Sequence, residues 1–533
     1  MPAAVALVVS RAIAQPTNSA GTGIYNIRDF GGRGDGKTLD TAALQSAVDA
    51  CNRNRGGTVL VPSGVFLIGT IELKSNVTLR IEADGKLLGS ADGKQYHAAE
   101  SIPLTGGWTM GDGNVALIFA SNAENVTIEG PGTIDGQGAQ FHSPTRGALP
   151  PAGISGNRRP HHLLFYRCRN LTVRDLSLVA GAYHSVRIAH SNFVKLDGIH
   201  IHNRVNGNND GFHLISSEHV HISNCDVRCQ DDACALFGSC KFITVTNCTF
   251  STRWSVFRFG GGEAENIVVS NCVIYDTYGC PIKIRCSTGT RYENMSFSNL
   301  VMSNVTGPIS IGIGEQRPRA AGAPLPTPGI VRNISFHGIR ATVAVPTLLP
   351  DMPFIDSFNP GEKKSAIILN GADGYIENID FQDLHVTFPG GGTAADAAGR
   401  EIPRFASEYY AIGVPPAFGL YARQVCGLTL NNVRFEVTAP EMRPAVVFDR
   451  VEDAGISAFA VRAHGSTGPL LRFTEARDVS LSGTRVLAPA AAFLDVQGSG
   501  SQNILIDGGD LSRAEKPVTF GAGTPQTAVK LRL

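Results

Sequence analysis

Short segments in which apolar and polar residues alternate recur along most of this chain. Examples are residues 124–128 (ENVTI), 169–173 (RNLTV), 265–269 (ENIVV) and 293–297 (ENMSF). Related segments begin at Ser191, Glu218, Lys241, Arg332, Glu377, Cys426, Ala454, Arg477 and Gln502. Alternation with a period of two predicts short strands that turn one face toward an apolar interior.

The spacing of these segments is nearly constant in the middle of the chain. Segments start at Arg169, Ser191, Glu218, Lys241, Glu265 and Glu293, so the intervals are 22, 27, 23, 24 and 28 residues. A repeat of this length indicates a solenoid, in which each repeat packs on its neighbours. Strand-rich coils of this size predict an all-β chain, folded as a single-stranded right-handed parallel β-helix with coils about 4.8 Å apart.

Stacking of the coils would bring residues of the same phase together. The acidic residues Asp210, Asp231 and Asp232 lie 8, 10 and 9 residues before the next segment. Five basic residues lie 7 to 12 residues before the start of the next segment, and so have a similar phase: His184, Arg253, Arg258, Lys283 and Arg285. Five successive coils therefore predict one charged stripe, roughly 20 Å long. Each charge alone would suit a solvated face, but adjacent like charges at Asp231 and Asp232 oppose each other and favour a functional site.

Cysteine recurs at a second phase. Cys225, Cys248 and Cys272 each follow an asparagine, at intervals of 23 and 24 residues. They predict an interior column of small apolar side chains, and the asparagines before them predict a ladder at a tight turn. The other cysteines lack zinc-like spacing with histidine, so no metal site is predicted. One or two disulfides remain open, without identifiable pairs.

Composition and charge narrow the possible functions. The chain has 533 residues, but the repeat runs without a linker-like break, so we predict one elongated domain over residues 22–533. Lys+Arg and Asp+Glu both total 46, a balance that argues against nucleic acid as a partner. No apolar run approaches the roughly 20 residues that span a bilayer. We expect a monomer that needs no cofactor.

The N-terminal residues are typical of a processed segment. Residues 3–9 form a short apolar run, and Ala-Ile-Ala at 12–14 is similar to a signal-peptidase site, although a basic start is missing. We therefore predict that residues 1–14 are a signal-peptide remnant and that the protein is secreted or periplasmic. Asp40 or Thr41 is then predicted to cap an amphipathic helix that ends near Cys51 and covers the first coil.

Four stretches lengthen the regular coils, at residues 141–160, 314–329, 347–364 and 389–411. Long loops in compact domains are disordered or form functional walls. We predict that the first two are walls, because they lie close in sequence to the charged stripe. The cleft is expected mainly on coils within residues 180–290, and residues 428–533 are expected to be scaffold coils and a C-terminal cap.

Two acidic motifs connect the chain to a known family. Asn208-Asn209-Asp210-Gly211 is followed 21 residues after Asp210 by Asp231-Asp232. These motifs resemble the Asn-Thr-Asp-Gly and Asp-Asp motifs of glycoside hydrolase family 28, the polygalacturonases and rhamnogalacturonan hydrolases. Residues 29–36 (DFGGRGDG) and 56–62 (GGTVLVP) are also similar to the start of many bacterial members. The resemblance covers about residues 25–514 and implies hydrolysis by three carboxylates, with inversion at the anomeric carbon.

Two motifs depart from the family pattern. The usual Gly-His-Gly is replaced by residues 251–254 (STRW), so that Arg253 or Trp254 takes the place of the histidine. The usual Arg-Ile-Lys is reversed as Lys283-Ile284-Arg285. Cations remain at both ends of the second motif, and a carboxylate-bearing sugar could still be held. The missing histidine puts ordinary endo-polygalacturonase activity in doubt.

Glycoside hydrolysis needs an acid at the leaving oxygen and a base that activates water. Asp231 is the candidate acid, and Asp210 and Asp232 are the candidates for the base. The candidate substrate-binding residues are His184, Asn208, Arg253, Trp254, Arg258, Lys283 and Arg285. Arginine suits uronic carboxylates because its planar fork donates two parallel hydrogen bonds.

Each binding residue also has a structural alternative. The cations could neutralise the aspartates as ion pairs, and His184 could make a structural hydrogen bond. Trp254 could stack on a sugar ring. The remaining histidines of the region alternate with apolar residues and are predicted on outer strand faces: His161, His162, His202, His213, His219 and His221.

Two rival functions fit the same sequence. A polysaccharide lyase would abstract the C5 proton of a uronate, with Arg253 or Lys283 as base and carboxylates holding calcium. A non-catalytic carbohydrate-binding β-helix would bind pectic fragments without turnover. The leaving-side sugar, galacturonate or rhamnose, and the choice between endo and exo action stay open at this point.

Overall fold

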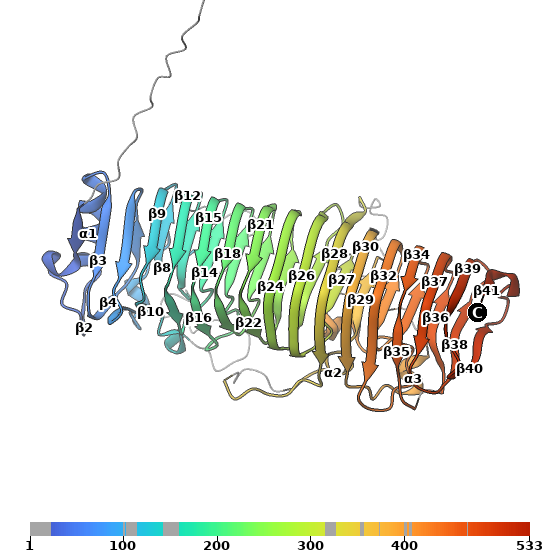
Figure 1. Ribbon diagram of the computed structural model, residues 1–533. Coiled ribbons are helices and arrows are strands. Elements are labelled where there is room, and N and C mark those ends of the chain that lie inside the picture. The colour runs from blue at the N-terminus through green and yellow to red at the C-terminus, as the bar shows by residue number, and fades with distance from the viewer. Residues whose placement is uncertain are drawn as a thin grey trace, which may run out of the picture.

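The computed structural model describes residues 23–99, 102, 114–141, 159–314, 327–351, 357–371, 374–398, 402–403, 408–465 and 467–532. Within these ranges the chain winds into an elongated stack of parallel strands, as Figure 1 shows. The predicted right-handed parallel β-helix is confirmed. The predicted signal-peptide remnant lies outside the described residues, so export stays a prediction. No helix in the described part of the chain is long and apolar enough to cross a membrane.

Two parallel sheets form the β-helix in the ranges given above. Sheet A has 26 strands: β1 (Ile24–Asn26), β2 (Asp35–Leu39), β3 (Gly57–Val61), β4 (Gly64–Ile68), β6 (Val77–Ile81), β7 (Gly85–Gly89), β9 (Glu124–Glu129), β10 (Thr133–Asp135), β12 (Arg169–Arg174), β13 (Ser177–Val179), β15 (Asn192–Asp197), β16 (His200–Asn203), β18 (Glu218–Ser223), β19 (Asp226–Cys229), β21 (Cys240–Thr246), β22 (Thr249–Thr252), β24 (Ala264–Thr277), β26 (Arg291–Val305), β28 (Gly329–Val343), β30 (Gly374–Phe388), β32 (Val425–Val437), β34 (Glu452–Ser457), β35 (Ala460–Arg462), β37 (Arg477–Val486), β39 (Gln502–Asp510) and β41 (Val529–Arg532). Sheet B has 15 strands: β5 (Ile71–Leu73), β8 (Ala116–Ser121), β11 (His161–Tyr166), β14 (Val186–Ala189), β17 (Phe212–Ile215), β20 (Cys234–Phe237), β23 (Ser255–Gly260), β25 (Cys280–Cys286), β27 (Ile309–Ile313), β29 (Ile367–Asn370), β31 (Leu420–Arg423), β33 (Val446–Asp449), β36 (Pro469–Thr474), β38 (Ala490–Gln497) and β40 (Ala514–Phe520). Each strand pairs with its equivalent in the next coil, so one coil adds one layer to the stack.

Sheet A bends where asparagines adopt a left-handed backbone conformation. Both β21 and β22 pair with β24, which runs through the bend as one long strand. Asn224, Asn247 and Asn271 each have a φ of 55° at this bend. Asparagine tolerates that conformation better than most L residues. The predicted asparagine turn is therefore confirmed at all three positions. One coil further on, Asn299 Nδ2 donates to Asn271 Oδ1 at 2.7 Å.

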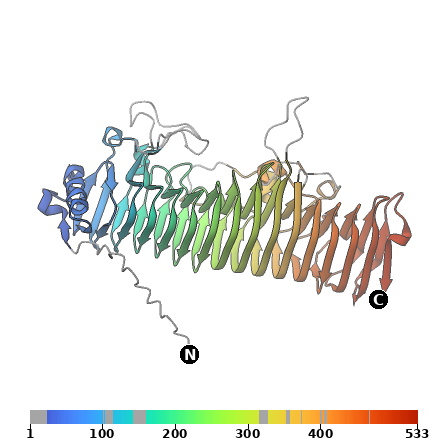
Figure 2. The ribbon, with the colours of Figure 1, turned by 90° about the horizontal axis from the view of Figure 1, so that it is seen from above.

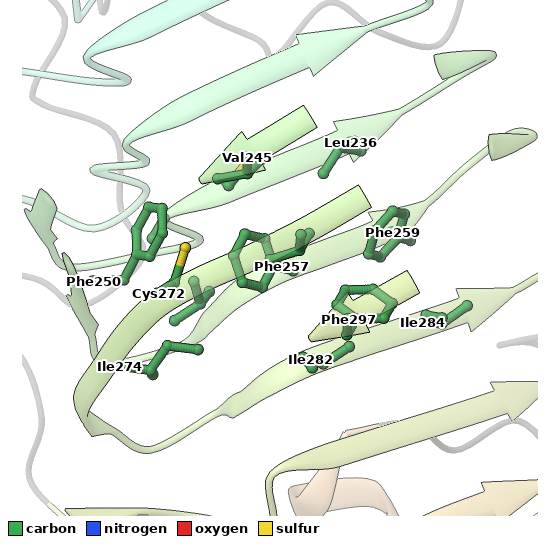
Figure 3. Packing of buried hydrophobic residues seen from close by; sticks show 14 of the residues in the cluster. Leu236, Val245, Phe250, Phe257, Phe259, Cys272, Ile274, Ile282, Ile284 and Phe297 are labelled. Atoms are coloured by element: carbon green, nitrogen blue, oxygen red, sulfur yellow. The ribbon is translucent and has the colours of Figure 1, made fainter. Parts of the chain in front are cut away.

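The interior of the β-helix is filled by the inward side chains of successive strands. Phe212, Cys234, Phe257 and Ile282 are register partners in sheet B and are fully buried. Figure 3 shows Phe257 packed among aliphatic and aromatic neighbours from both sheets. Each such side chain stabilises the fold by about 1.5–3 kcal/mol. One apolar core thus runs along the stack and fixes which residues must point outward.

The cysteines belong to this core. Cys225, Cys248 and Cys272 are buried, and the Cys225 N–H donates to Cys248 Sγ at 3.4 Å. The predicted interior column is confirmed. All eleven cysteines are free and ten are buried, so the fold uses them as small apolar side chains and forms no disulfide.

Helix α1 (Thr41–Arg53) covers the N-terminal end of the stack, as predicted. Asp40 stands at its N-cap position without a side-chain bond to the helix. The Asp40 carboxylate instead accepts from the backbone N–H groups of Arg33 and Gly34, at 2.8 and 3.0 Å. The predicted Asp40 side-chain cap is therefore wrong, because this carboxylate holds the preceding turn.

Two of the four insertions place short helices beside sheet B. The remaining helices and 3-10 turns of the described residues are α2 (Pro360–Lys363), α3 (Ala394–Ala397), α4 (Tyr409–Ile412), η1 (Ile27–Phe30), η2 (Gly93–Gln95), η3 (Gly138–Phe141) and η5 (Gln526–Ala528). The Tyr409 hydroxyl donates to Ala366 O at 2.6 Å and anchors α4 to the β-helix. Figure 2 shows the yellow and orange helical segments along one side of the stack. The first two insertions fall mainly outside the described residues, so walls there remain a prediction.

Candidate active site

The outward side chains of sheet B form a row across neighbouring coils. Arg187, His213, Ala235, Arg258 and Lys283 are register partners on β14, β17, β20, β23 and β25. Register partners in a parallel sheet stand about 4.8 Å apart. Four of the five carry a basic or titratable group, and all five are buried. Since the inward positions of the same strands belong to the core, the sequence alternation itself directs these groups to the outer face.

The three predicted acidic residues lie in the turns that lead into β17 and β20. The backbone N–H of Gly211 donates to Asp232 O at 3.0 Å, which joins the two turns. The Asp231 carboxylate accepts from Asn208 Nδ2 at 3.2 Å and from the Asp232 N–H at 2.9 Å. Asp232 Oδ1 accepts from the Ser255 N–H at 3.3 Å. Adjacent coils therefore hold the acidic groups together, with Asn208 bridging the two turns.

Burial and neighbouring acidic groups raise the pKa values of Asp210 and Asp231. Burial, and then the charge of Asp232, raises the pKa of Asp210 well above its usual range. Burial, and then the charges of Asp210 and Asp232, raises the pKa of Asp231 in the same way, while Lys283 acts to lower it. Crowded carboxylates of this kind retain a proton at a pH where an exposed carboxylate has lost it. The cluster can therefore hold an acid and a base at once.

Two histidines lie next to the Asp210 carboxylate. His213 Nδ1 lies 2.7 Å from Asp210 Oδ2, and His184 Nε2 lies 3.7 Å from Asp210 Oδ1. The two imidazoles stack with centroids 4.4 Å apart and planes at 15°. His184 is fully buried, and burial lowers its pKa well below the usual value, so it stays neutral. Within the described residues neither ring nitrogen of His184 has a hydrogen-bond partner, so the structural hydrogen bond given as its alternative is not formed.

The same His184–Asp210–His213 group has donor atoms close enough to consider a metal, all within 4.8 Å of one another. Two ligands about 2.0 Å from one tetrahedral ion stand about 3.3 Å apart. The 2.7 Å contact of His213 with Asp210 is shorter and is a hydrogen bond. Near-parallel rings also face each other instead of converging on one ion. The geometry suits orientation of Asp210 better than metal coordination.

The other histidines, predicted on outer strand faces, divide into exposed and buried residues. His202 and His221 lie on exposed outer faces, as predicted. His161, His162 and His213 are buried. His161 Nε2 lies 3.2 Å from Arg187 Nη1, and His162 Nε2 lies 2.9 Å from Val179 O. Alternation in the sequence identified the strand, but it did not reveal that one outer face is covered.

The predicted cations form ion pairs with glutamates from the insertions. Arg253 Nη2 lies 2.7 Å from Glu362 Oε1, and both side chains are 4% exposed. Lys283 Nζ lies 2.8 Å from Glu408 Oε2, and Arg258 Nε lies 4.0 Å from Glu408 Oε1. The cations therefore form structural ion pairs, as the alternative interpretation proposed. Their partners are Glu362 and Glu408, not the aspartates.

Aromatic groups lie beside the paired cations. Lys283 Nζ stands 5.5 Å from the Trp254 ring centre, and the Arg253 guanidinium stands 4.7 Å from it. Tyr410 meets Trp254 edge to face, with centroids 6.2 Å apart. Tyr410 is 56% exposed, so this end of the candidate site presents an aromatic surface that can stack on a sugar. Arg285 is half-buried there, and burial followed by Arg258 lowers its pKa.

Residues 51–349, more than half of the chain, match the sequence profile described as Glycosyl hydrolases family 28. The chain belongs to this family. It is 33% identical to a probable polygalacturonase of Vitis vinifera over 294 residues, which cover 54% of this chain and 56% of that protein. The match thus spans little more than half of the relative's length.

Solved structures show the same fold. A hyperthermoactive exopolygalacturonase from Thermotoga maritima has a TM-score of 0.55 at 22% identity, covering 75% of this chain and 91% of that one. A family 28 exopolygalacturonase from Yersinia enterocolitica has a TM-score of 0.57 at 19% identity, covering 87% and 79%. At these identities the likeness concerns the β-helix alone.

Four residues of this candidate site were missed in the sequence. Arg187 and Arg159 both lower the pKa of Asp210, and so oppose the effect of burial. The Arg159 guanidinium donates to Gly207 O at 2.6 Å and to Asn208 Oδ1 at 3.3 Å. Arg187 could have been found, because it shares the outward phase of the row in sheet B. Glu362 and Glu408 could not have been found, because the insertions do not follow the repeat of the coils.

Proposed function

We propose that this family 28 chain is a glycosidase that hydrolyses α-linked galacturonic acid in pectic polysaccharides or oligosaccharides. The observation that carries the proposal is the group of three acidic side chains on adjacent coils, with the pKa values of Asp210 and Asp231 raised. Family membership and the relative named as a probable polygalacturonase support the substrate class. The cations and aromatic rings beside the group support binding of an acidic sugar chain.

In the proposed reaction Asp231 donates its proton to the glycosidic oxygen as the bond to the anomeric carbon breaks. Asp210 and Asp232 orient one water molecule on the opposite face of the sugar and accept its proton as its oxygen bonds to that carbon. His213 holds the Asp210 carboxylate in one orientation. The product anomer is inverted, and Asp231 regains its proton from solvent before the next cycle.

A lyase mechanism is less well supported by the ion pairs. A lyase base must be able to lose its proton, and Arg253 and Lys283 were the candidates. Both are held within 2.8 Å of a glutamate oxygen. A nearby carboxylate stabilises the protonated cation and so opposes its action as a base. The hydrolase is therefore favoured over the lyase.

The proposal is tested by incubating the protein with homogalacturonan and rhamnogalacturonan oligosaccharides in ¹⁸O-labelled water. We expect each cleavage to place one labelled oxygen on the anomeric carbon of the new reducing end, and proton NMR should first detect the β anomer there. Unsaturated uronate products would instead identify a lyase, and binding without any product would identify a carbohydrate-binding protein. We further propose that the chain acts as an exported monomer; N-terminal sequencing of the exported protein and sedimentation would test both points.

A further inference from the structure

Arg159 stands at the end of the first insertion and reaches the turn that carries Asp210. Its guanidinium donates to Gly207 O at 2.6 Å and to Asn208 Oδ1 at 3.3 Å. The same guanidinium lies over the ring of Tyr183, with its carbon 4.2 Å from the ring centre. The hydrogen bonds join parts of the chain that are 48 and 49 residues apart. One side chain therefore ties the end of the insertion to the turn.

The base and the tip of this turn are held differently. At the base, Asn209 Oδ1 accepts from the backbone N–H groups of Val205 and Asn206, at 3.0 and 2.6 Å. At the tip, Gly207 and Asn208 are both exposed. The contacts of the guanidinium thus restrain the part of the turn that is most open to solvent.

The contact with Arg159 decides which way the Asn208 amide points. An arginine side chain only donates hydrogen bonds, so the atom that faces it must be the carbonyl oxygen of Asn208. The amide nitrogen then faces Asp231 and donates to its Oδ2 at 3.2 Å. The other oxygen of this carboxyl group accepts from the Asp232 N–H at 2.9 Å. Both oxygens of the candidate acid thus face a donor, which sets the plane of the carboxyl group.

The charge of Arg159 also acts on the candidate base. Burial, and then the charge of Asp232, raises the pKa of Asp210, and the charges of Arg187 and Arg159 oppose this rise. Loss of the Arg159 charge should therefore raise the pKa of Asp210 further and move the acidic limb of the pH–rate profile to higher pH. The other titratable or charged groups beside Asp210 stay unchanged when Arg159 is replaced: Asp231, Asp232, Arg187, His213 and His184.

We infer that Arg159 is a positioning residue, which orients the acid Asp231 through the side-chain amide of Asn208. The inference deepens the proposed function and rests on it for the role of Asp231. The planar fork of an arginine is needed, because it donates to Gly207 O and Asn208 Oδ1 at once. A lysine would keep the charge but would donate from a single nitrogen.

Turnover of tetragalacturonate separates the fork from the charge. In Arg159→Ala we expect kcat to fall about tenfold with little change in KM, because an interaction that orients the acid acts on the chemical step. The acidic limb should also move to higher pH. Arg159→Lys should return this limb toward its original pH but leave kcat low, and it guards against a folding defect in the alanine variant. Full kcat in either variant, or a raised KM with constant kcat, would overturn the inference.

A matched control is available on the same sheet. Arg167 is exposed, and its guanidinium lies over the Tyr166 ring at 5.1 Å. It thus makes the same kind of contact with a tyrosine as Arg159 does. Arg167→Ala should keep kcat and the pH–rate profile of the unmodified protein. A loss equal to that of Arg159→Ala would overturn the inference, because any arginine on a tyrosine would then have the same effect.

A second readout does not depend on turnover. The side-chain amide signals of Asn208, identified by their loss in Asn208→Asp, are followed by ¹⁵N NMR across the titration of Asp231. They should shift with pH in the unmodified protein, and this shift should shrink in Arg159→Ala. An unchanged shift would overturn the inference. Absence of any turnover by the unmodified protein would refute the proposed hydrolysis, while the amide signals would still report on Arg159, so the two failures are distinguishable.

Discussion

The acidic and basic ends of the candidate site are built in different ways. The three aspartates come from two adjacent coils and are held by the backbone and side chains of those coils. Arg253 and Lys283 also come from regular coils, but Glu362 and Glu408 reach them from 109 and 125 residues further along the chain. The repeat thus supplies the reacting groups, while the insertions set the net charge that a substrate meets.

Removal of the candidate acid should have the largest effect. Asp231→Asn keeps the size of the side chain, but it cannot protonate the leaving oxygen at the required rate. We expect kcat to fall roughly 10²- to 10⁴-fold, as is typical when a general acid is lost, with the fold intact. Turnover of galacturonate oligosaccharides and circular dichroism would measure this. Asp226→Asn, an exposed carboxylate five residues earlier on β19, is the control; retained turnover in Asp231→Asn would contradict the assignment.

At the basic end, removal of one charge should chiefly affect stability. Glu362→Gln leaves the buried Arg253 guanidinium without its carboxylate. Breaking a buried ion pair by removing one partner costs about 3–5 kcal/mol. Urea unfolding should detect a loss of this size. Asp383→Asn is the control, because its pair with Arg340 is 39–50% exposed and exposed pairs contribute about 0–1 kcal/mol. Equal losses in the two variants would show that the buried pair has no special role.

Most of the fold could be predicted because a β-helix repeats one local rule. Alternation of apolar and polar residues predicted the strands, and the nearly constant interval predicted that the coils stack. The asparagine before Cys248 predicted the turn. The same rule placed Asp210 and Asp231 on neighbouring coils. The repeat could not predict contacts between residues that are far apart in the sequence. Glu408 reaches Lys283 from an insertion without alternation or period, and no local pattern determines where such a segment packs.

The burial of His213 could not be predicted for a related reason. A period of two separates the two faces of a strand but does not distinguish a covered outer face from a solvated one. His213 and His221 both occupy outward positions, yet only His213 lies under neighbouring groups and contacts Asp210. The difference arises from what packs on each sheet, which is a property of the whole molecule.

Loss of the His213–Asp210 bond should have an intermediate effect on the acidic end. His213→Phe keeps a ring that can stack on His184 but removes the hydrogen-bond donor. A hydrogen bond to a charged group contributes about 1.5–3 kcal/mol, so kcat should fall roughly 10- to 100-fold with little change in KM. His221→Phe, on an exposed outer face, is the matched control and should leave kcat unchanged. An equal rise in KM with constant kcat would instead mean that His213 serves substrate binding.

The pH dependence of stability should separate the two ends by its sign. Because burial and neighbouring acids raise the pKa of Asp231 above its ordinary value of 3.8, the folded protein keeps a proton that the unfolded chain releases. Stability of the unmodified protein should therefore fall as pH rises from about 4 through the raised pKa, by about 1.4 kcal/mol for each pH unit in that interval. Asp231→Asn removes this titration.

The two proteins should thus have nearly equal free energies of unfolding below pH 3.8, where Asp231 is protonated in both states. At pH 7 Asp231→Asn should be the more stable, which urea unfolding at the two pH values would measure. Glu362→Gln should be less stable than the unmodified protein at pH 7, because the charge of Glu362 is paired with that of Arg253. If Asp231→Asn were also less stable there, Asp231 would be a paired structural carboxylate. Opposite signs would mean that the acidic end holds repelling charges for catalysis, while the basic end is stabilised by its insertions.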